Sequence, residues 1–199
     1  MAKILPITGL ATLLGGSHFL ECKNIWLFLV GLMMPPKNIF VYGTLLFDEV
    51  VHALTGENCL TIPAKLIGYR RCRIEDPHRE AVGPVVVRKK GACTSGKVLL
   101  NLSCESFRAI ELFEESAGGY EPVNSEVLCN DGRLLMVTFY RAQNDLSPMI
   151  RSENWSEQDF QNAALRLYVE NRIPSLLKKW RELGLLLESN SNDGKLQDS

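Results

Sequence analysis

The stretch NIFVYGTLLF, residues 38–47, is composed like a buried strand that stops at a glycine. Residues 39–42 are all β-branched or aromatic, which is typical of a strand covered on both faces. Gly43 removes a side chain where the strand ends, and Thr44 and Leu45 follow. A glycine here predicts either a sharp turn or a close approach of another group to the main chain. The first interpretation needs no ligand, whereas the second predicts a loop whose bare amides hold one.

The composition is that of an ordinary globular protein. A chain of 199 residues, 46% hydrophobic and 23% charged, is long enough for one domain with a full core. Its formal net charge of -1 argues against a dedicated nucleic-acid binder, which would carry a basic excess. The basic clusters at 70–73 and 88–90 fit solvated strand ends or loops better than a phosphate-binding patch.

The cysteines and histidines indicate no metal site. The six cysteines form no CxxC pair, and the three histidines form no HExxH. Such scattered cysteines predict buried thiols in a reducing compartment, and therefore a cytoplasmic protein. The chain also lacks GxGxxG, Walker and GxSxG motifs, so nucleotide binding and serine hydrolysis have no local support.

The two ends of the chain differ from its middle. Residues 1–36 form an apolar leader with a faint signal-peptide outline but no clean cleavage site. Its second apolar run, residues 25–34, is shorter than the about 20 residues that span a bilayer, so we expect no stable membrane span. The leader is either an optional or mis-assigned extension or a membrane-associating segment. We expect the domain over 37–186 and a disordered tail over 187–199.

Hydrophobic periodicity predicts strands and helices that alternate along the domain. Ser103 is a plausible N-cap, Lys90-Gly91 predicts a chain turn, and Asp131-Gly132 predicts a hairpin. The expected strands are 62–73, 82–88, 96–102, 121–129 and 133–141, and the expected helices 48–54 and 104–115.

The last third of the domain is predicted to be helical. One helix begins at Ser156, with an inward face of Phe160, Ala164, Leu167 and Tyr168, and a second begins near Pro174. Strands followed by helices indicate an α+β fold with a curled or barrel-like sheet.

Two ordered motifs give the chain a family resemblance. Residues 42–45 read Tyr-Gly-Thr-Leu, and residues 110–114 form an amphipathic helix end that Tyr120 follows closely. Together they resemble the γ-glutamylcyclotransferase-like family, in its γ-glutamylamine-cyclotransferase and plant avirulence-induced-protein-like branch, over roughly residues 38–141. The resemblance implies a small mixed β-barrel with flanking helices.

The resemblance also implies a reaction. A γ-glutamyl amide or amine would cyclise to 5-oxoproline and a free amine, with a small-molecule substrate and no cofactor. The α-amine is an ammonium at neutral pH, so a base must take its proton before it can attack. Glu114 falls on the family's catalytic glutamate. The implied substrate-binding residues are Tyr42, Gly43, Thr44, Leu45 and Tyr120.

Other interpretations stay open at this point. Without the resemblance, Glu114 reads as a solvated carboxylate, Tyr120 as a core residue and Tyr42 as a residue that closes the barrel. The chain also departs from the family, because Glu115 and Ser116 stand where a glycine often follows the catalytic glutamate. The alternative function is a non-catalytic module that binds a small ligand or a protein on the same fold. The sequence predicts neither the leaving amine nor the oligomeric state.

A cytoplasmic location predicts that the two N-glycosylation sequons stay unmodified. These sequons begin at Asn101 and Asn154. Intact-mass spectrometry of the protein from its native cells should show no glycan on either asparagine. A glycan at either position would contradict the location.

Overall fold

The structure is a computed structural model that describes residues 37–75 and 82–187. The leader at 1–36 and all but the first residue of the expected tail lie outside the described residues. Our expectations for both segments therefore stay predictions.

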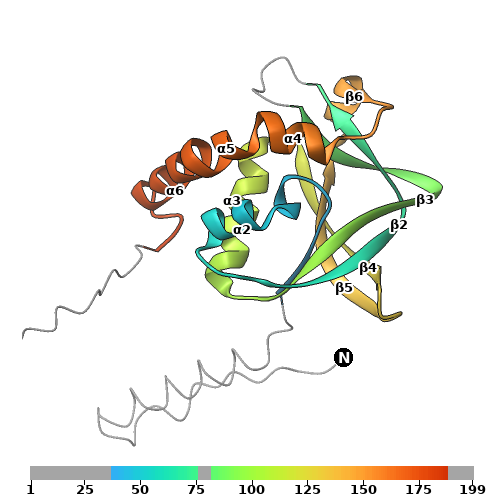
Figure 1. The fold of residues 1–199 in the computed structure, drawn as a ribbon, viewed down its shortest axis with the longest axis horizontal. Helices are drawn as coiled ribbons and strands as arrows, with labels where there is room; N and C mark the ends of the chain where they lie inside the picture. The colour runs from blue at the N-terminus through green and yellow to red at the C-terminus, as the bar shows by residue number, and fades with distance from the viewer. Residues whose placement is uncertain (1–36, 76–81, 188–199) are drawn as a thin grey trace, which may run out of the picture. The chain divides into compact units, whose positions relative to one another are not determined.

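In the described part of the chain, five strands close into a mixed barrel (Figure 1). The strand order is β3-β1-β5-β4-β2, and pairing of β2 with β3 closes it. β1 and β5 are parallel, and the other barrel pairs are antiparallel. The barrel strands are β1 (Lys37–Val41), β2 (Leu60–Ile74), β3 (Gly83–Leu102), β4 (Tyr120–Cys129) and β5 (Leu134–Ala142). A short strand, β6 (Ile150–Arg151), pairs with the end of β2. The expected α+β barrel is confirmed.

β1 is buried on both faces, as its composition predicts. Phe40 packs inside the barrel against residues from the other four strands, among them Leu66 and Phe139. Its neighbours Ile39 and Val41 point to the opposite face and join a second core formed with the helices. Because successive side chains of a strand alternate, one strand supplies both cores.

The helices cover one side of the barrel, over the outer face of β1 (Figure 1). Ser103 caps α3 by accepting a hydrogen bond from the Ser106 amide at 3.0 Å, and Ser156 caps α4 through the Asp159 amide at 3.1 Å. Both predicted helix starts are therefore confirmed. The helical elements are η1 (Thr44–Leu46), α2 (Asp48–Thr55), α3 (Cys104–Ala117), η2 (Asn144–Met149), α4 (Glu157–Ala163), α5 (Leu165–Leu167), the π-helical η3 (Tyr168–Arg172) and α6 (Ile173–Glu182).

The predicted turn at Lys90-Gly91 was wrong. β3 runs through it as one strand and stays antiparallel to β2 on both sides. The pairing shifts there, because residues 89–92 of β3 lie opposite Gly68 alone. Glycines of positive φ on both strands, Gly68 and Gly91, allow this bulge. The glycine signal therefore marks a bend within a long strand, which helps the sheet to close.

The predicted inward position of Leu167 was also wrong. Leu167 is 42% exposed, whereas Leu165 packs against the helix-side core together with Tyr168. Ala164 has non-helical dihedral angles (φ -128°) that end α4, and η3 then winds as a π-helix. The break at Ala164 precedes Leu167 and shifts its helical phase, and η3 shifts the phase again after it. A uniform 3.6-residue period anticipates neither shift.

The close packing around Gly96 can be tested by substitution. A Cβ at this position would lie 2.2 Å from the Val41 carbonyl oxygen and 2.7 Å from the Phe40 ring. Gly96→Ala should therefore lower the free energy of unfolding by about 1–3 kcal/mol in urea denaturation, because the added methyl group could fit only if the β1 backbone moved. Ser95→Ala, at an exposed neighbour, is the control and should change it by less than about 0.5 kcal/mol. Equal stability of both variants would contradict the packing.

Candidate active site

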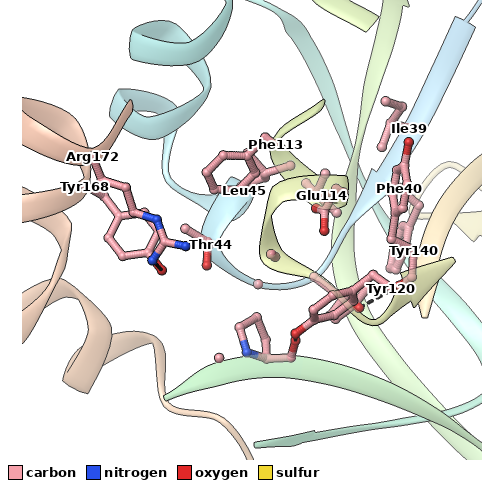
Figure 2. A pocket seen from close by; sticks show the side chains of 16 residues that line it. Ile39, Phe40, Thr44, Leu45, Phe113, Glu114, Tyr120, Tyr140, Tyr168 and Arg172 are labelled. Atoms are coloured by element: carbon pink, nitrogen blue, oxygen red, sulfur yellow. Dashed lines mark hydrogen bonds between the residues drawn. The ribbon is translucent and has the colours of Figure 1, made fainter. Parts of the chain in front are cut away.

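A pocket lies where the end of β1 meets the ends of α3 and the C-terminal helices (Figure 2). The start of β3 forms its floor, and β4 begins at its edge. All six residues that the sequence singled out line this pocket: Tyr42, Gly43, Thr44, Leu45, Glu114 and Tyr120. Segments that are far apart in the chain thus converge on one cavity.

The glycine of the first motif is explained by its neighbour Pro84. A Cβ at Gly43 would lie 2.0 Å from Cγ of Pro84, so only glycine fits against this ring. The close approach expected from the sequence is therefore made by a protein side chain. Gly43 still lines the pocket, but its lack of a side chain needs no ligand.

Two basic side chains hold the main chain around the motif. Nη1 of Arg71 donates to the Tyr42 carbonyl oxygen at 2.9 Å and also pairs with Glu157 at 2.9 Å. Beyond η1, Nζ of Lys97 donates to the Leu46 carbonyl oxygen at 2.8 Å. The loop is therefore fixed on both sides by charged donors that β2 and β3 supply.

Of the three carboxylates at the end of α3, Glu114 points away from the other two. Glu111 and Glu115 each lie 3.5 Å from Nη1 of Arg108, and the Glu115 side chain is 60% exposed. Glu114 is half-buried, and its carboxylate points into the pocket between Thr44 and Tyr120 (Figure 2). The structure thus separates Glu114 from its acidic neighbours.

Tyrosines surround this carboxylate. The Tyr42 hydroxyl donates to the Tyr140 carbonyl oxygen at 2.6 Å, and the Tyr120 hydroxyl donates to the Pro84 carbonyl oxygen at 2.8 Å. Burial raises the pKa of Tyr42 well above its usual value, and nearby Tyr120 and Glu114 raise it further. The pKa of Tyr140 is also raised, first by burial and then by the carboxylates at the end of α3. Both phenols are therefore neutral at physiological pH.

Sequence reasoning missed one wall of the pocket. Tyr168 and Arg172, from the π-helical η3, line it on the side of the C-terminal helices (Figure 2). They lie four residues apart, a spacing that could have marked them as a pair on one helical face. That they face the pocket depends on the phase shift before η3, which has no sequence signal. Pro84, Phe113 and Tyr140 were missed as well.

The described residues form neither a metal-binding cluster nor a membrane-spanning helix. At 37–75 and 82–187, no cluster of three or more His, Cys, Asp or Glu side chains could hold a metal ion. Within the same ranges, no helix is long and apolar enough to cross a membrane.

A known protein family matches the part of the chain that carries the two motifs. The family model described as "Gamma-glutamyl cyclotransferase, AIG2-like" matches residues 39–157. AIG2-like protein D of Arabidopsis thaliana is 31% identical over 54% of this chain and 69% of its own length. A solution structure of an Arabidopsis thaliana protein shares 22% identity over 74% of this chain and 92% of its own, with a TM-score of 0.52. A structure titled "Gamma-glutamyl cyclotransferase" shares 16% identity over 81% and 94%, with a TM-score of 0.50.

The raised pKa of Tyr42 predicts how stability depends on alkaline pH. Above about pH 10 the unfolded chain loses this phenolic proton while the folded chain keeps it, so folding becomes less favourable as pH rises. Tyr42→Phe should cost about 1–2 kcal/mol of unfolding free energy at pH 7, because the Tyr140 carbonyl loses its donor. This cost should shrink by about 1.4 kcal/mol per pH unit above pH 10 in urea denaturation. If the difference in unfolding free energy between the two proteins stayed constant with pH, it would contradict the burial of the Tyr42 hydroxyl.

Proposed function

The chain belongs to the γ-glutamyl cyclotransferase, AIG2-like family, and on this premise we propose that it cyclises a γ-glutamyl amide or amine. The products are 5-oxoproline and a free amine. The observation that carries the proposal is the half-buried carboxylate of Glu114, which points into a pocket beside the Tyr-Gly-Thr-Leu loop (Figure 2). The reaction needs a base at such a place.

The proposed reaction begins with a proton transfer. Glu114 takes a proton from the α-ammonium group of the substrate, and the free amine then attacks its own γ-carbonyl carbon. The tetrahedral intermediate collapses when the bond to the leaving nitrogen breaks, and Glu114 returns its proton to that nitrogen. The ring nitrogen gives up its second proton, and the released amine takes up one proton and leaves as an ammonium ion. Because the attack is intramolecular, a pocket that holds the substrate folded removes much of the entropic barrier.

The loop between Gly43 and Leu45 is the proposed binding site for the glutamyl part. Thr44 opens the short helix η1, whose first amides have no partner within the helix. Such amides can hold the α-carboxylate and the developing oxyanion. Arg71 and Lys97 fix the main chain on either side, so the amides would be positioned before the substrate arrives. Tyr42 and Tyr120 complete this wall.

A cytoplasmic location is part of the proposal. The five cysteines in the described part of the chain carry free thiols, and Cys93 and Cys104 are exposed. Exposed thiols persist best where the surroundings are reducing.

The direct test is an assay for 5-oxoproline. The purified chain is incubated with a panel of γ-glutamyl amines and γ-glutamyl amino acids, and 5-oxoproline release is followed by chromatography. Turnover of any member supports the enzyme. No release over the whole panel would contradict it and favour the non-catalytic binding module.

Replacing Glu114 should separate catalysis from binding. Glu114→Gln keeps the size and polarity of the side chain but cannot accept the ammonium proton. We expect kcat to fall about 10²–10⁴-fold, the usual cost of losing acid–base catalysis. Binding of a γ-glutamyl ligand, measured by calorimetry, should change far less, because the loop amides remain.

Glu115→Gln is the matched control for this experiment. It removes the same charge one position further along α3, from a side chain that is exposed and lies 3.5 Å from Arg108. The control should retain near-normal turnover. An equal loss in both variants, or normal turnover in Glu114→Gln, would remove Glu114 from the mechanism.

A further inference from the structure

A second cavity, about 520 Å³ in volume, lies between β2 and β4 and shares no lining residue with the candidate active site. It forms because these neighbouring strands pair only at Lys65–Leu128 and at one adjacent position. Beyond that point both strands continue without pairing with each other. The gap between residues 67–69 of β2 and 123–125 of β4 is therefore a seam in the barrel wall.

The β4 side of the seam presents main-chain groups that face β2. The Asn130 amide donates to the Pro63 carbonyl oxygen of β2 at 3.0 Å, whereas the Cys129 amide donates at 2.9 Å to the chain that leads into β5. Because main-chain groups alternate sides along a strand, those of Asn124 and Glu126 also face β2. Within residues 37–75 and 82–187, no strand pairs with them there.

The facing edge of β2 is open as well. β3 pairs with β2 along its other side, and β6 pairs with it only from Arg73 onwards. In the part of the chain that the structure describes, residues 66–72 therefore have no strand on the side of β4. Open edges of this kind accept an extended peptide as an added strand.

The side chains around the seam indicate which peptide fits. The described residues that line it include two cations, Arg88 and Lys90, and no carboxylate. The guanidinium carbon of Arg88 lies 5.8 Å from the centre of the Tyr69 ring, and Lys90 belongs to the bulge of β3 opposite Gly68. Ile67 adds an exposed apolar side chain. The seam thus suits a strand that carries acidic and apolar side chains.

We propose that the seam binds an extended, acidic segment of another protein, which adds a strand along the edge of β4. Its main chain hydrogen-bonds to Asn124 and Glu126, and its carboxylates pair with Arg88 and Lys90. A nucleic acid could also meet the two cations, but it has no row of amides and carbonyls to pair with strand edges. This role does not involve Glu114 and is independent of the proposed enzyme activity.

The test uses a short fluorescein-labelled peptide that alternates glutamate and valine and is capped at both ends. Its binding to the full chain is followed by fluorescence anisotropy. Two relatives of the peptide serve as controls: one has lysine in place of glutamate, and one is N-methylated at its amides. The second keeps the carboxylates but cannot donate main-chain hydrogen bonds. We expect the acidic peptide to bind at least about tenfold more tightly than either control.

Variants of the two lining cations test the charge contact. The double variant Arg88→Gln/Lys90→Gln should weaken binding of the acidic peptide about tenfold or more. The matched control is Arg166→Gln/Lys178→Gln, which removes two cations from the C-terminal helices at side chains that are 86% and 79% exposed. This control should bind the peptide as the unmodified chain does.

A substitution in β4 tests the strand edge itself. Asn124→Pro removes one seam-facing amide and should weaken binding, because proline cannot donate to the added strand. Asn124→Ala is its control, since both changes remove the side chain that accepts from Thr138 but alanine keeps the amide. Asn124→Ala should bind normally. Circular dichroism checks that both variants are folded, and the N-methylated peptide tests the same contact without any change to the protein.

Four results would overturn the proposal. These are equal binding of the acidic and lysine peptides, equal binding of the N-methylated peptide, binding that survives the loss of both lining cations, and tighter binding of a single-stranded oligonucleotide than of the acidic peptide. The second result would leave a charged surface that adds no strand, and the last would assign the seam to nucleic acid.

Discussion

The contact between Gly43 and Pro84 is the constraint on which the rest of the site depends. The proline ring fills the space where a side chain at position 43 would stand. Its carbonyl oxygen also accepts the Tyr120 hydroxyl. One residue at the start of β3 therefore joins the loop after β1 to the start of β4. This contact ties together the two walls beside Glu114 at the pocket itself.

The same strand that carries the motif also organises both cores. Phe40 and Tyr42 fill the barrel, while Ile39 and Val41 pack under the helices. A strand clamped in this way cannot slide by one residue, because every side chain would then move to the wrong core. The fixed register of β1 also fixes the position of the loop that follows it. The site is thus built on a strand that is packed on both faces, as a binding loop on a rigid scaffold requires.

Local sequence patterns predicted what depends on local physics. The β-branched and aromatic run of β1, the cap at Ser103 and the Asp131-Gly132 hairpin all formed as expected. The two family motifs also found six pocket residues. They could not show that Pro84 packs against Gly43, since nothing in a local window reports an approach between residues 41 positions apart. Sequence patterns also could not predict the π-helical turn that brings Arg172 to the pocket. A π-helix does not follow the 3.6-residue hydrophobic period by which helices are recognised.

The position of β1 in the barrel has a consequence for biosynthesis. Its neighbours are β3 and β5, and Ile39 pairs with Thr138, which the ribosome adds 99 residues later. At 5–20 residues per second, this interval lasts about 5 to 20 s. The first strand of the barrel to be made is thus among the last to find all of its partners. Throughout that time the side of β1 that will face β5 is an open strand edge, which a chaperone can shield.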